Sequence, residues 1–329
     1  MRRRTLLALS AALPLSPISA TPAAWAQPAP DWPTQPLRII VPYAPGGPTD
    51  IPARLLAEEL AKVLPQRPVV ENRTGAGVVV GTDVVAKATD GHTVHYTTIS
   101  HAVLRPLFPK LPFDPVADFA PVALVGQIPM VLMVNKDLPV NGLQGLMRLY
   151  RDAPGKYDYG SSGNGGALHL ASELFLRQSG GLKVTHVPYR GSAAAMPDLL
   201  NGTVSMMLDV ANNTLPYVQR GEVKSLAVSA ERRLPQLPDV PTFKEQGLPD
   251  YEAYTWHMVL GPKAVPEAVV QRLNAAINRV LAEPSLQKRL EDLAMQVRSD
   301  STPESTAQWL QAEMAKWEPI IRDAGIKSD

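Results

Sequence analysis

The chain has 329 residues, of which 45% are hydrophobic and none is cysteine. Its 32 Lys and Arg residues nearly balance 31 Asp and Glu residues, for a formal net charge of +1. The lack of cysteine excludes disulfides, thiol catalysis and Cys-ligated metals, and the balanced charge argues against a nucleic-acid or anionic-membrane partner. The length and apolar content are sufficient for two domains with packed cores.

Residues 1–26 have the pattern of a secretory signal peptide. Three arginines precede a Leu-rich run, and residues 24–26 (Ala-Trp-Ala) offer a small-residue cleavage site. The apolar run is too short to span a membrane. We therefore expect a mature chain that begins near Gln27, with 29 basic and 31 acidic residues and a net charge of −2. We expect it in the periplasm, exported by the general secretory or the twin-arginine route.

Short β-branched runs alternate with helical patterns over most of the remaining chain. We expect strands at 37–41, 68–71, 93–98, 122–125, 131–135, 157–159, 183–187, 204–208, 224–229 and 256–260. Helical spacing is found at 52–64, 143–150 and 168–176, and two further helices begin at Pro266 and Pro303. This alternation predicts an α/β fold with mostly parallel sheets flanked by helices.

The order of the elements predicts two lobes. No strand is expected after about residue 297, so the last helices must pack on an earlier sheet. A chain that leaves its first domain near residue 126 and returns near residue 251 forms two lobes joined by two crossings. We therefore expect residues 27–126 and 251–329 in lobe 1, and residues 127–250 in lobe 2.

A glycine-rich loop at 43–50 (Tyr-Ala-Pro-Gly-Gly-Pro-Thr-Asp) joins the first strand to the first helix. Gly46 and Gly47 let a ligand approach the backbone, and a helix N-terminus attracts anions. Thr49 or Asp50 is expected to cap the helix. An ordinary strand-to-helix turn explains the same residues. If an anion binds here, we expect contacts from Thr49 and the glycine amides, since the Asp50 carboxylate would repel it unless it turned back onto amides.

A second loop of this kind occupies 159–166 (Tyr-Gly-Ser-Ser-Gly-Asn-Gly-Gly), over a hundred residues later. Core-type residues flank it on both sides, which is not typical of a flexible linker. Its expected donors to an anion are Ser161, Ser162, Gly163, Asn164 and Gly165. Two such loops suggest two lobes that grip one anionic ligand.

Two other segments lie where α/β sheets place ligands, at the ends of strands. Thr98 and Ser100 follow one strand, and Asp209 follows another. We expect one of these segments or the other to contact the far end of the ligand. Asp209 would favour an amine or hydroxyl donor there. Helix capping by Asp209 and Asn212 is an equally good interpretation of the second segment.

Motifs for enzymes and cofactors are not found in the sequence. The glycine-rich stretch 75–81 lacks the spacing of a dinucleotide fingerprint, and we expect it to pack a helix tightly on the sheet. Residues 160–164 lack the last glycine of a nucleophile elbow. His169 and Glu173 are expected to pair on a helix surface, and the single histidines at 92, 95, 101, 186 and 257 are expected to be structural. The sequence therefore predicts no enzyme, no cofactor and no metal site.

Several phrases of the sequence resemble the solute-binding proteins of tripartite tricarboxylate transporters, the Bug-type periplasmic receptors. The matching phrases are at 39–43, 46–50, 70–77, 87–93, 159–165, 169–171, 186–191 and 237–242. They occur in order over nearly all of the mature chain. Val78 departs from the family, which often has glycine there, and segment 97–101 is less typical of it.

The resemblance implies a type II, Venus-flytrap binding protein whose two α/β lobes close on a small carboxylate. In that family backbone amides and small hydroxyls hold the carboxylate without an obligatory arginine. The positions that match are Tyr43, Gly47, Thr49, Ser161, Gly163 and Asn164, and Asp209 matches a family aspartate. The implied partners are the carboxylate and the permease subunits of a tripartite transporter, and the implied receptor is a monomer.

Two other functions remain open at this stage. A sensor accessory would bind the ligand in the same way and then dock on a membrane signalling protein. A secreted hydrolase would use a nucleophile such as Ser162, and would need a base within reach of it.

Overall fold

The computed structural model describes residues 32–327 of the chain. The predicted signal peptide, 1–26, and the first residues assigned to lobe 1, 27–31, lie outside the described residues. The strands are β1 (Arg38–Val41), β2 (Val69–Asn72), β3 (Thr93–Thr97), β4 (Phe119–Asn135), β5 (Asp158–Ser161), β6 (Thr185–Pro188), β7 (Met206–Val210), β8 (Val223–Val228), β9 (Tyr254–Pro262) and β10 (Gln296–Val297).

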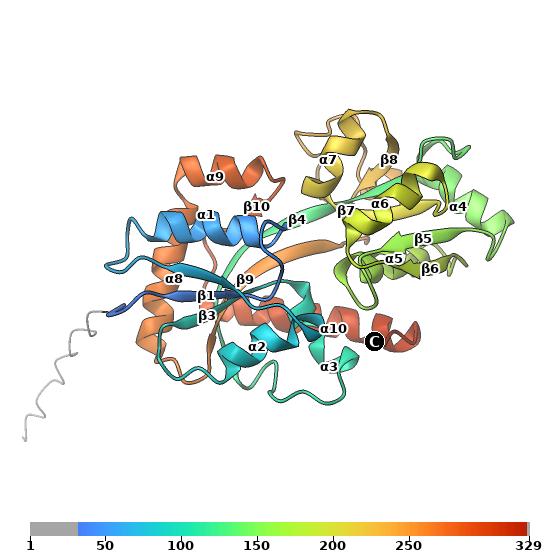
Figure 1. Cartoon of the computed structure of the whole chain (residues 1–329). Coiled ribbons are helices and arrows are strands. Elements are labelled where there is room, and N and C mark those ends of the chain that lie inside the picture. The colour runs from blue at the N-terminus through green and yellow to red at the C-terminus, as the bar shows by residue number, and fades with distance from the viewer. Residues whose placement is uncertain (1–31, 328–329) are drawn as a thin grey trace, which may run out of the picture. The chain divides into compact units, whose positions relative to one another are not determined.

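The helices alternate with these strands as the sequence predicted (Figure 1). They are α1 (Asp50–Leu60), α2 (Val79–Ala86), α3 (Leu104–Leu107), α4 (Gly142–Asp152), α5 (Ala167–Gln178), α6 (Ser192–Asn201), α7 (Ala211–Gln219), α8 (Glu267–Leu281), α9 (Pro284–Glu291) and α10 (Pro303–Asp323), with short 3₁₀ turns at Ala76–Val78, Ile99–His101 and Lys244–Gln246. In the part of the chain that the structure describes, no helix is both long enough and apolar enough to cross a membrane.

The strands form two groups that share β4 (Figure 1). In the first group the order is β2-β1-β3-β9-β4, and in the second it is β4-β7-β5-β6, with β8 also pairing with β4. The parallel pairs are β1 with β2 and β3, and β5 with β6 and β7. The long strands β4 and β9 pair antiparallel with their neighbours. The parallel pairing that the sequence predicted is therefore confined to the outer strands, and the sheets are mixed.

The 17-residue strand β4 connects the two groups. Residues 119–129 pair with β9, and residues 130–134 pair with β7. The sequence predicted two separate strands here, at 122–125 and 131–135, and the structure corrects this to a single strand. Its side chains are almost all buried from Val122 onward, so the run is apolar on both faces and gives no alternation that would mark its true length. At its centre, the Ser229 hydroxyl accepts from the Met130 amide and donates to the Ala253 carbonyl, which fixes β4 to the segment that leads into β9.

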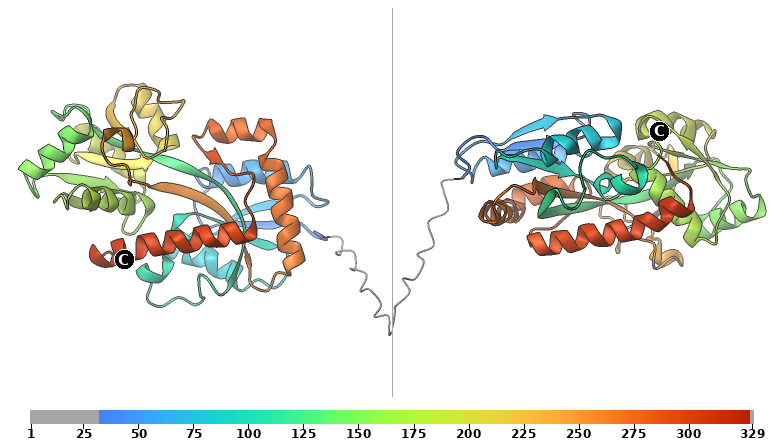
Figure 2. Two further views of the ribbon diagram at one scale, coloured as in Figure 1. Left: turned by 180° about the vertical axis from the view of Figure 1, so that it is seen from behind. Right: turned by 90° about the horizontal axis from the view of Figure 1, so that it is seen from below.

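The last helices return to the first strand group. Helix α8 packs on β4 and α1, whereas α10 packs on β4 and reaches α3, α5 and α8 (Figure 2). Thr302 caps α10 in a capping box with Ser305, which accounts for the predicted start at Pro303. The indole nitrogens of Trp256 and Trp317 both donate to Glu313, at 2.8 and 2.9 Å. The bond from Trp256 holds α10 against β9, whereas the bond from Trp317 lies within α10 itself.

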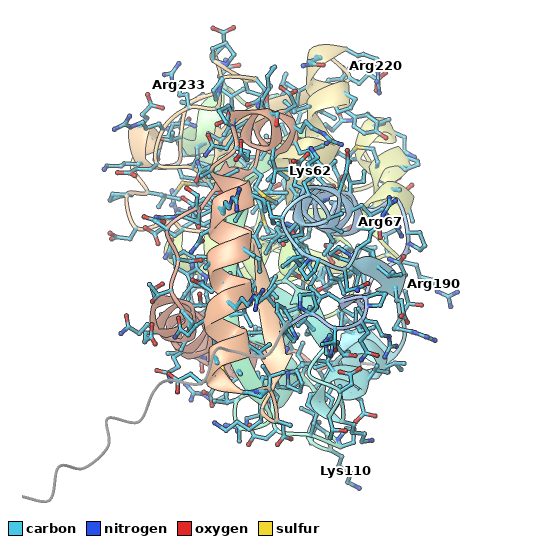
Figure 3. The ribbon with its side chains drawn as sticks, turned by 90° about the vertical axis from the view of Figure 1, so that its left-hand side faces the viewer. Lys62, Arg67, Lys110, Arg190, Arg220 and Arg233 are labelled. Atoms are coloured by element: carbon cyan, nitrogen blue, oxygen red, sulfur yellow. The ribbon has the colours of Figure 1, made fainter. Side chains whose placement is uncertain are left out.

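Basic side chains lie on the outside of the molecule. Lys110, Arg190 and Arg220 are exposed and point away from the ribbon in Figure 3. Several other cations form exposed ion pairs, among them Arg233 with Glu245. Surface pairs of this kind each contribute little to stability, so the buried apolar side chains carry most of it.

Candidate functional site

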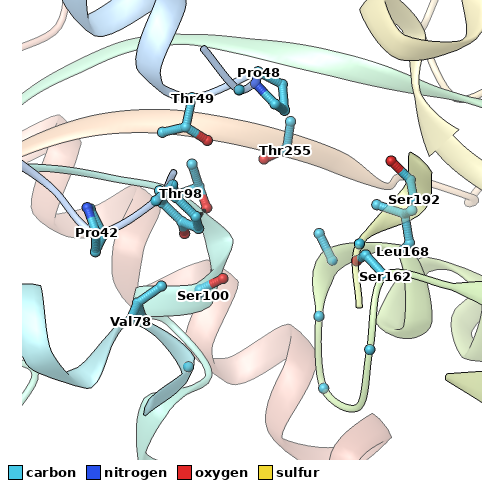
Figure 4. Close-up of a pocket in the computed structure, with 18 of the residues that line it drawn as sticks. Pro42, Pro48, Thr49, Val78, Thr98, Ser100, Ser162, Leu168, Ser192 and Thr255 are labelled. Carbon is cyan, nitrogen blue, oxygen red and sulfur yellow. Dashed lines mark hydrogen bonds between the residues drawn. The ribbon is translucent and has the colours of Figure 1, made fainter. Parts of the chain in front are cut away.

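A cavity of about 600 Å³ is lined by loops from both strand groups (Figure 4). Its lining includes ten of the twelve predicted ligand-binding residues: Tyr43, Gly47, Thr49, Thr98, Ser100, Ser162, Gly163, Asn164, Gly165 and Asp209. The remaining two, Gly46 and Ser161, do not line it. The structure thus brings segments over a hundred residues apart to one cavity of the size that small molecules occupy.

In the first loop, the Asp50 carboxylate is turned back onto the loop itself. It accepts hydrogen bonds from the Gly46 amide, from Arg54 and from Asn72, each at 2.8 Å. Burial alone would raise the pKa of Asp50, but these bonds together lower it below its ordinary value. The carboxylate is therefore neutralised within the loop, and the Gly46 amide is engaged by it rather than facing the cavity.

Hydroxyl groups form one side of the cavity. Thr49 occupies the cap position of α1, but its hydroxyl makes no cap hydrogen bond, so the predicted capping role is not seen. The Tyr43 hydroxyl lies 2.6 Å from that of Thr98 and joins the first loop to the end of β3. Thr49, Thr98 and Ser100 lie together on the left of Figure 4. A carboxylate here would meet hydroxyl donors and no formal positive charge.

The second loop uses several of its predicted donors internally. The Ser161 hydroxyl is fully buried, lies 2.6 Å from His186 Nε2 and accepts from the Gly163 amide at 3.1 Å. The Gly165 amide donates to His169 Nδ1 at 3.0 Å. Ser161 therefore stabilises the conformation of the loop without lining the cavity, and Ser162 is the serine that lines it.

Two stacked imidazoles support the second loop. The rings of His169 and His186 lie 3.7 Å apart, inclined by 18°. Burial lowers the pKa of His169 to about 3, with a contribution from His186, and burial lowers the pKa of His186 to about 4. Both rings are therefore neutral near pH 7, so they act as hydrogen-bonding and packing groups.

The prediction of a surface pair between His169 and Glu173 is wrong, because His169 is only 5% exposed. Its Nε2 atom lies 4.0 Å from Glu173, which accepts a hydrogen bond from the Tyr159 hydroxyl instead. Helix spacing could not show this, since His169 of α5 is covered by His186, which comes from β6. Within residues 32–327 no group of three His, Cys, Asp or Glu residues is placed to hold a metal ion.

A contact between serine and histidine is a feature of hydrolytic sites, but here it lies outside the cavity. His186 contacts Ser161, which is buried, rather than Ser162, which faces the cavity. A substrate in the cavity would therefore not meet the paired hydroxyl.

Asp209 ends β7 and is only 1% exposed. Its Oδ1 atom accepts from the Val210 amide at 2.7 Å and from Asn213 at 3.3 Å. Its Oδ2 atom has no hydrogen-bond partner among the described residues, although the residue lines the cavity. Burial raises the pKa of Asp209 to about 6, although the Val210 amide, the Ser192 hydroxyl and Asn213 each act to lower it.

The sequence did not identify the apolar part of the lining. Val103, Leu107 and Phe108 reach the cavity from α3 and its flanks, and Leu168 reaches it from α5. Apolar residues near a turn give no signal that distinguishes a cavity wall from a core. Stretch 75–81 does pack closely, as predicted: a Cβ atom at Gly81 would lie 2.6 Å from the Arg73 carbonyl.

Comparison with known proteins agrees with this architecture. The model of the tripartite tricarboxylate transporter family receptor matches residues 52–326. The chain belongs to this family. A protein from the tcbD-tcbE intergenic region of Pseudomonas sp. (strain P51) is 37% identical over 322 residues, which cover 97% of this chain and 94% of that protein. Protein BugT of Bordetella pertussis is 35% identical, over 90% of this chain and 91% of BugT. The resemblance drawn from the sequence phrases is thereby confirmed.

Two solved structures share the fold with substantial sequence identity. The R. palustris protein Rpa4515, solved with adipate, is 34% identical with a TM-score of 0.80, over 90% of this chain and 99% of that one. MatC from Rhodopseudomonas palustris, solved with bound malate, is also 34% identical, with a TM-score of 0.76, over 88% of this chain and all of that one. The fold is that of a two-lobe periplasmic binding protein, as predicted.

Proposed function

We propose that this chain is a periplasmic receptor that captures a small carboxylate in the cavity and delivers it to the permease subunits of a tripartite transporter. The observation that carries the proposal is the cavity itself. Loops from both strand groups line it, and these loops are rich in glycine and hydroxyl groups. Adipate and malate in the two R. palustris proteins support a carboxylate as the ligand.

The carboxylate would be held by hydroxyls rather than by a cation. Thr49 and Ser100 offer hydroxyls on one side of the cavity, and Ser162 offers one on the other (Figure 4). Hydrogen bonds to a charged acceptor are stronger than those between neutral groups, and more so where water is excluded. Closure of the two sides around the ligand would therefore stabilise the bound state.

We further propose that closure moves two lobes, residues 27–126 with 251–329 against residues 127–250. The chain crosses between these units in β4 and again just ahead of β9. A ligand that contacts both sides favours the closed arrangement, because it binds that arrangement more tightly than the open one. The closed monomer would then be the form that the permease recognises.

Binding without catalysis is the function that the lining supports. None of the residues that line the cavity is histidine, lysine, arginine or glutamate. General acid–base or nucleophilic chemistry commonly needs such groups beside the reacting atoms. Asp209 is the only acid in this lining, and no histidine, lysine or arginine lies beside it there.

The proposal is tested by thermal shift and calorimetry on the purified protein with mono-, di- and tricarboxylates. A ligand at about 100 times its Kd stabilises the folded state by roughly 2.7 kcal/mol, which gives a measurable rise in melting temperature. The substitution Thr49→Val keeps the side-chain shape and removes the hydroxyl. We expect it to weaken binding by about 10- to 100-fold, the effect of losing a hydrogen bond to a charged group.

The matched control is Thr185→Val, on the exposed edge strand β6 and outside the cavity. It makes the same chemical change and is expected to leave the affinity unaltered. A panel in which no carboxylate raises the melting temperature of well-folded protein would refute the proposed function. Equal effects of the two valine variants would refute the role of Thr49.

A further inference from the structure

A groove separate from the cavity lies between α5 and α10. Its volume is about 500 Å³, and its walls include Arg177 of α5 and Ala312 of α10. Helix α5 packs on β5 and β7 of the second strand group, whereas α10 begins in the first proposed lobe and packs on β4 and α8. Figure 2 shows α10 running alongside β4 and β9 toward α5. This groove, which we call the rear groove, therefore lies between the two proposed lobes, as the cavity does.

The cavity and the rear groove lie on opposite faces of β9. Thr255 lines the cavity (Figure 4), and the next residue, Trp256, donates to Glu313 of α10, which lines the rear groove. Successive side chains of a strand point to opposite faces. Both residues lie close to the point where the chain returns to the first proposed lobe. The cavity and the rear groove are therefore on opposite sides of this crossing.

Helix α5 extends from the cavity to the rear groove. Leu168 in its first turn lines the cavity, and Arg177 and Gln178 in its last turn line the groove. The helix has 12 residues and is about 18 Å long. Because lobes rotate as rigid bodies about a hinge, a rotation that brings the first turn of α5 toward Thr98 and Ser100 carries its last turn away from α10. Closure of the cavity should therefore widen the rear groove.

The rear groove is free to change its width. Arg177 donates to the Asp323 carboxylate of α10 at 2.9 Å, and the two side chains are 53% and 46% exposed. An exposed ion pair of this kind contributes little, so it does not prevent widening. Narrowing is limited by the bulk of the side chains in the groove. Ala312 is exposed there and contributes only a methyl group.

We propose that the rear groove sets the affinity of the cavity: bulk in the groove favours the closed arrangement and strengthens ligand binding without touching the ligand. The inference rests on the proposed function and its lobe closure, and adds a means of regulation to it. The apparent affinity for a carboxylate rises with the closed fraction of the free protein. By linkage, a bound carboxylate widens the rear groove.

Ala312→Trp tests this coupling, because it places an indole ring in the rear groove and leaves the cavity lining unchanged. Binding of adipate and of malate is measured by isothermal calorimetry. We expect the affinity for whichever acid binds to rise by about 3- to 10-fold, and by less in Ala312→Phe; a closed fraction of about 10% permits at most about tenfold. The matched control is Ala315→Trp, which is exposed on the same helix but outside the groove and should leave the affinity unaltered.

A second measurement follows closure without any ligand. The chain has no cysteine, so Val80→Cys and Ala193→Cys together provide two unique sites for spin labels. Both positions are exposed, in the first turns of α2 and α6, and their neighbours Val78 and Ser192 lie on opposite sides of the cavity in Figure 4. Pulsed electron paramagnetic resonance measures the distance between the labels. We expect Ala312→Trp to shift this distance in the free protein toward shorter values, and the control to leave it unchanged.

The outcomes separate this inference from the proposed function. If Ala312→Trp matches the control in both affinity and label distance, the inference is overturned and the carboxylate receptor stands. Weaker binding in Ala312→Trp, or tighter binding with an unchanged label distance, would overturn it as well. If neither acid binds, the label distance alone decides the coupling, and the wider carboxylate panel decides the proposed function.

Discussion

A substitution at Gly165 would have two costs, one from backbone strain and one from a steric clash. The backbone of Gly165 is left-handed, and an added side chain would point at Leu107. Its φ angle is +67°, and a Cβ atom there would lie 2.5 and 2.8 Å from the two methyl carbons of Leu107 and 3.2 Å from Cγ. Leu107 is buried, so the whole isobutyl group would have to move. The substitution Gly165→Ala should therefore push apart the two sides of the cavity.

The expected cost has two parts. An L-residue with left-handed backbone costs about 1–2 kcal/mol, and overpacking in a well-packed region costs about 1–3 kcal/mol more. Gly165→Ala should thus lower the free energy of unfolding by about 2–5 kcal/mol. Gly181→Ala is the matched control, since its φ is +73° and no atom lies within 4 Å of the added Cβ. It should cost only the first part, about 1–2 kcal/mol.

The assay is urea unfolding of both variants, of Leu107→Ala and of the double variant Gly165→Ala/Leu107→Ala. Truncation of Leu107 removes the group that the new methyl would strike, so the two changes should not add. We expect a favourable coupling of about 1–3 kcal/mol, equal to the overpacking part. Calorimetry with a bound carboxylate should show weaker binding for Gly165→Ala than for Gly181→Ala.

Two results would refute this reasoning. Equal destabilisation by Gly165→Ala and Gly181→Ala would mean that only backbone strain matters. A coupling energy within about 0.5 kcal/mol of zero would mean that Leu107 and position 165 do not meet in solution.

The remaining predictions concern buried histidines and the second loop. Burial lowers the pKa of His101 to about 4 and of His257 to about 3, so the folded state binds fewer protons than the unfolded state below about pH 6.5. Their contribution to stability is complete above pH 6.5 and should be lost as the pH falls from 6.5 toward 4, by about 3 kcal/mol for each histidine. A urea midpoint that stays constant from pH 6.5 to 4 would contradict this prediction. So would a midpoint that falls by the same amount in His257→Leu as in the unmodified protein. Ser161→Ala should cost about 1–3 kcal/mol and weaken carboxylate binding, although Ser161 does not line the cavity. Binding and urea midpoint both equal to the unmodified protein would show that the bond to His186 does not support the loop.

Local sequence located the two loops of the site. Glycine-rich segments 43–50 and 159–166 each follow a strand and precede a helix, and short-range preferences are enough to place such a turn. Local sequence could not tell which serine faces the cavity. Ser161 is the last residue of β5 and Ser162 begins the turn, so a change of chain direction between neighbours sends one hydroxyl to His186 and leaves the other on the cavity wall.

Other features depended on partners far away in the chain. The apolar run of β4 has no alternation of polar and apolar residues, so the sequence did not show how long the strand is. Its antiparallel pairing with β9 joins residues more than a hundred positions apart. The unpartnered oxygen of Asp209 follows from which groups pack around β7. A strand-end aspartate in the sequence is consistent with capping and with ligand contact alike.

By itself, the sequence determined the α/β alternation, the glycine-rich turns at helix starts and the family, because these depend on residue type and on spacing along the chain. Only the tertiary structure decided that Leu107 and Phe108 form part of the wall, that His169 and His186 stack behind the second loop and that the buried Asp209 belongs to the lining. The reason is physical: a turn is set by interactions between neighbours, whereas a cavity is the space left when segments distant in sequence pack together.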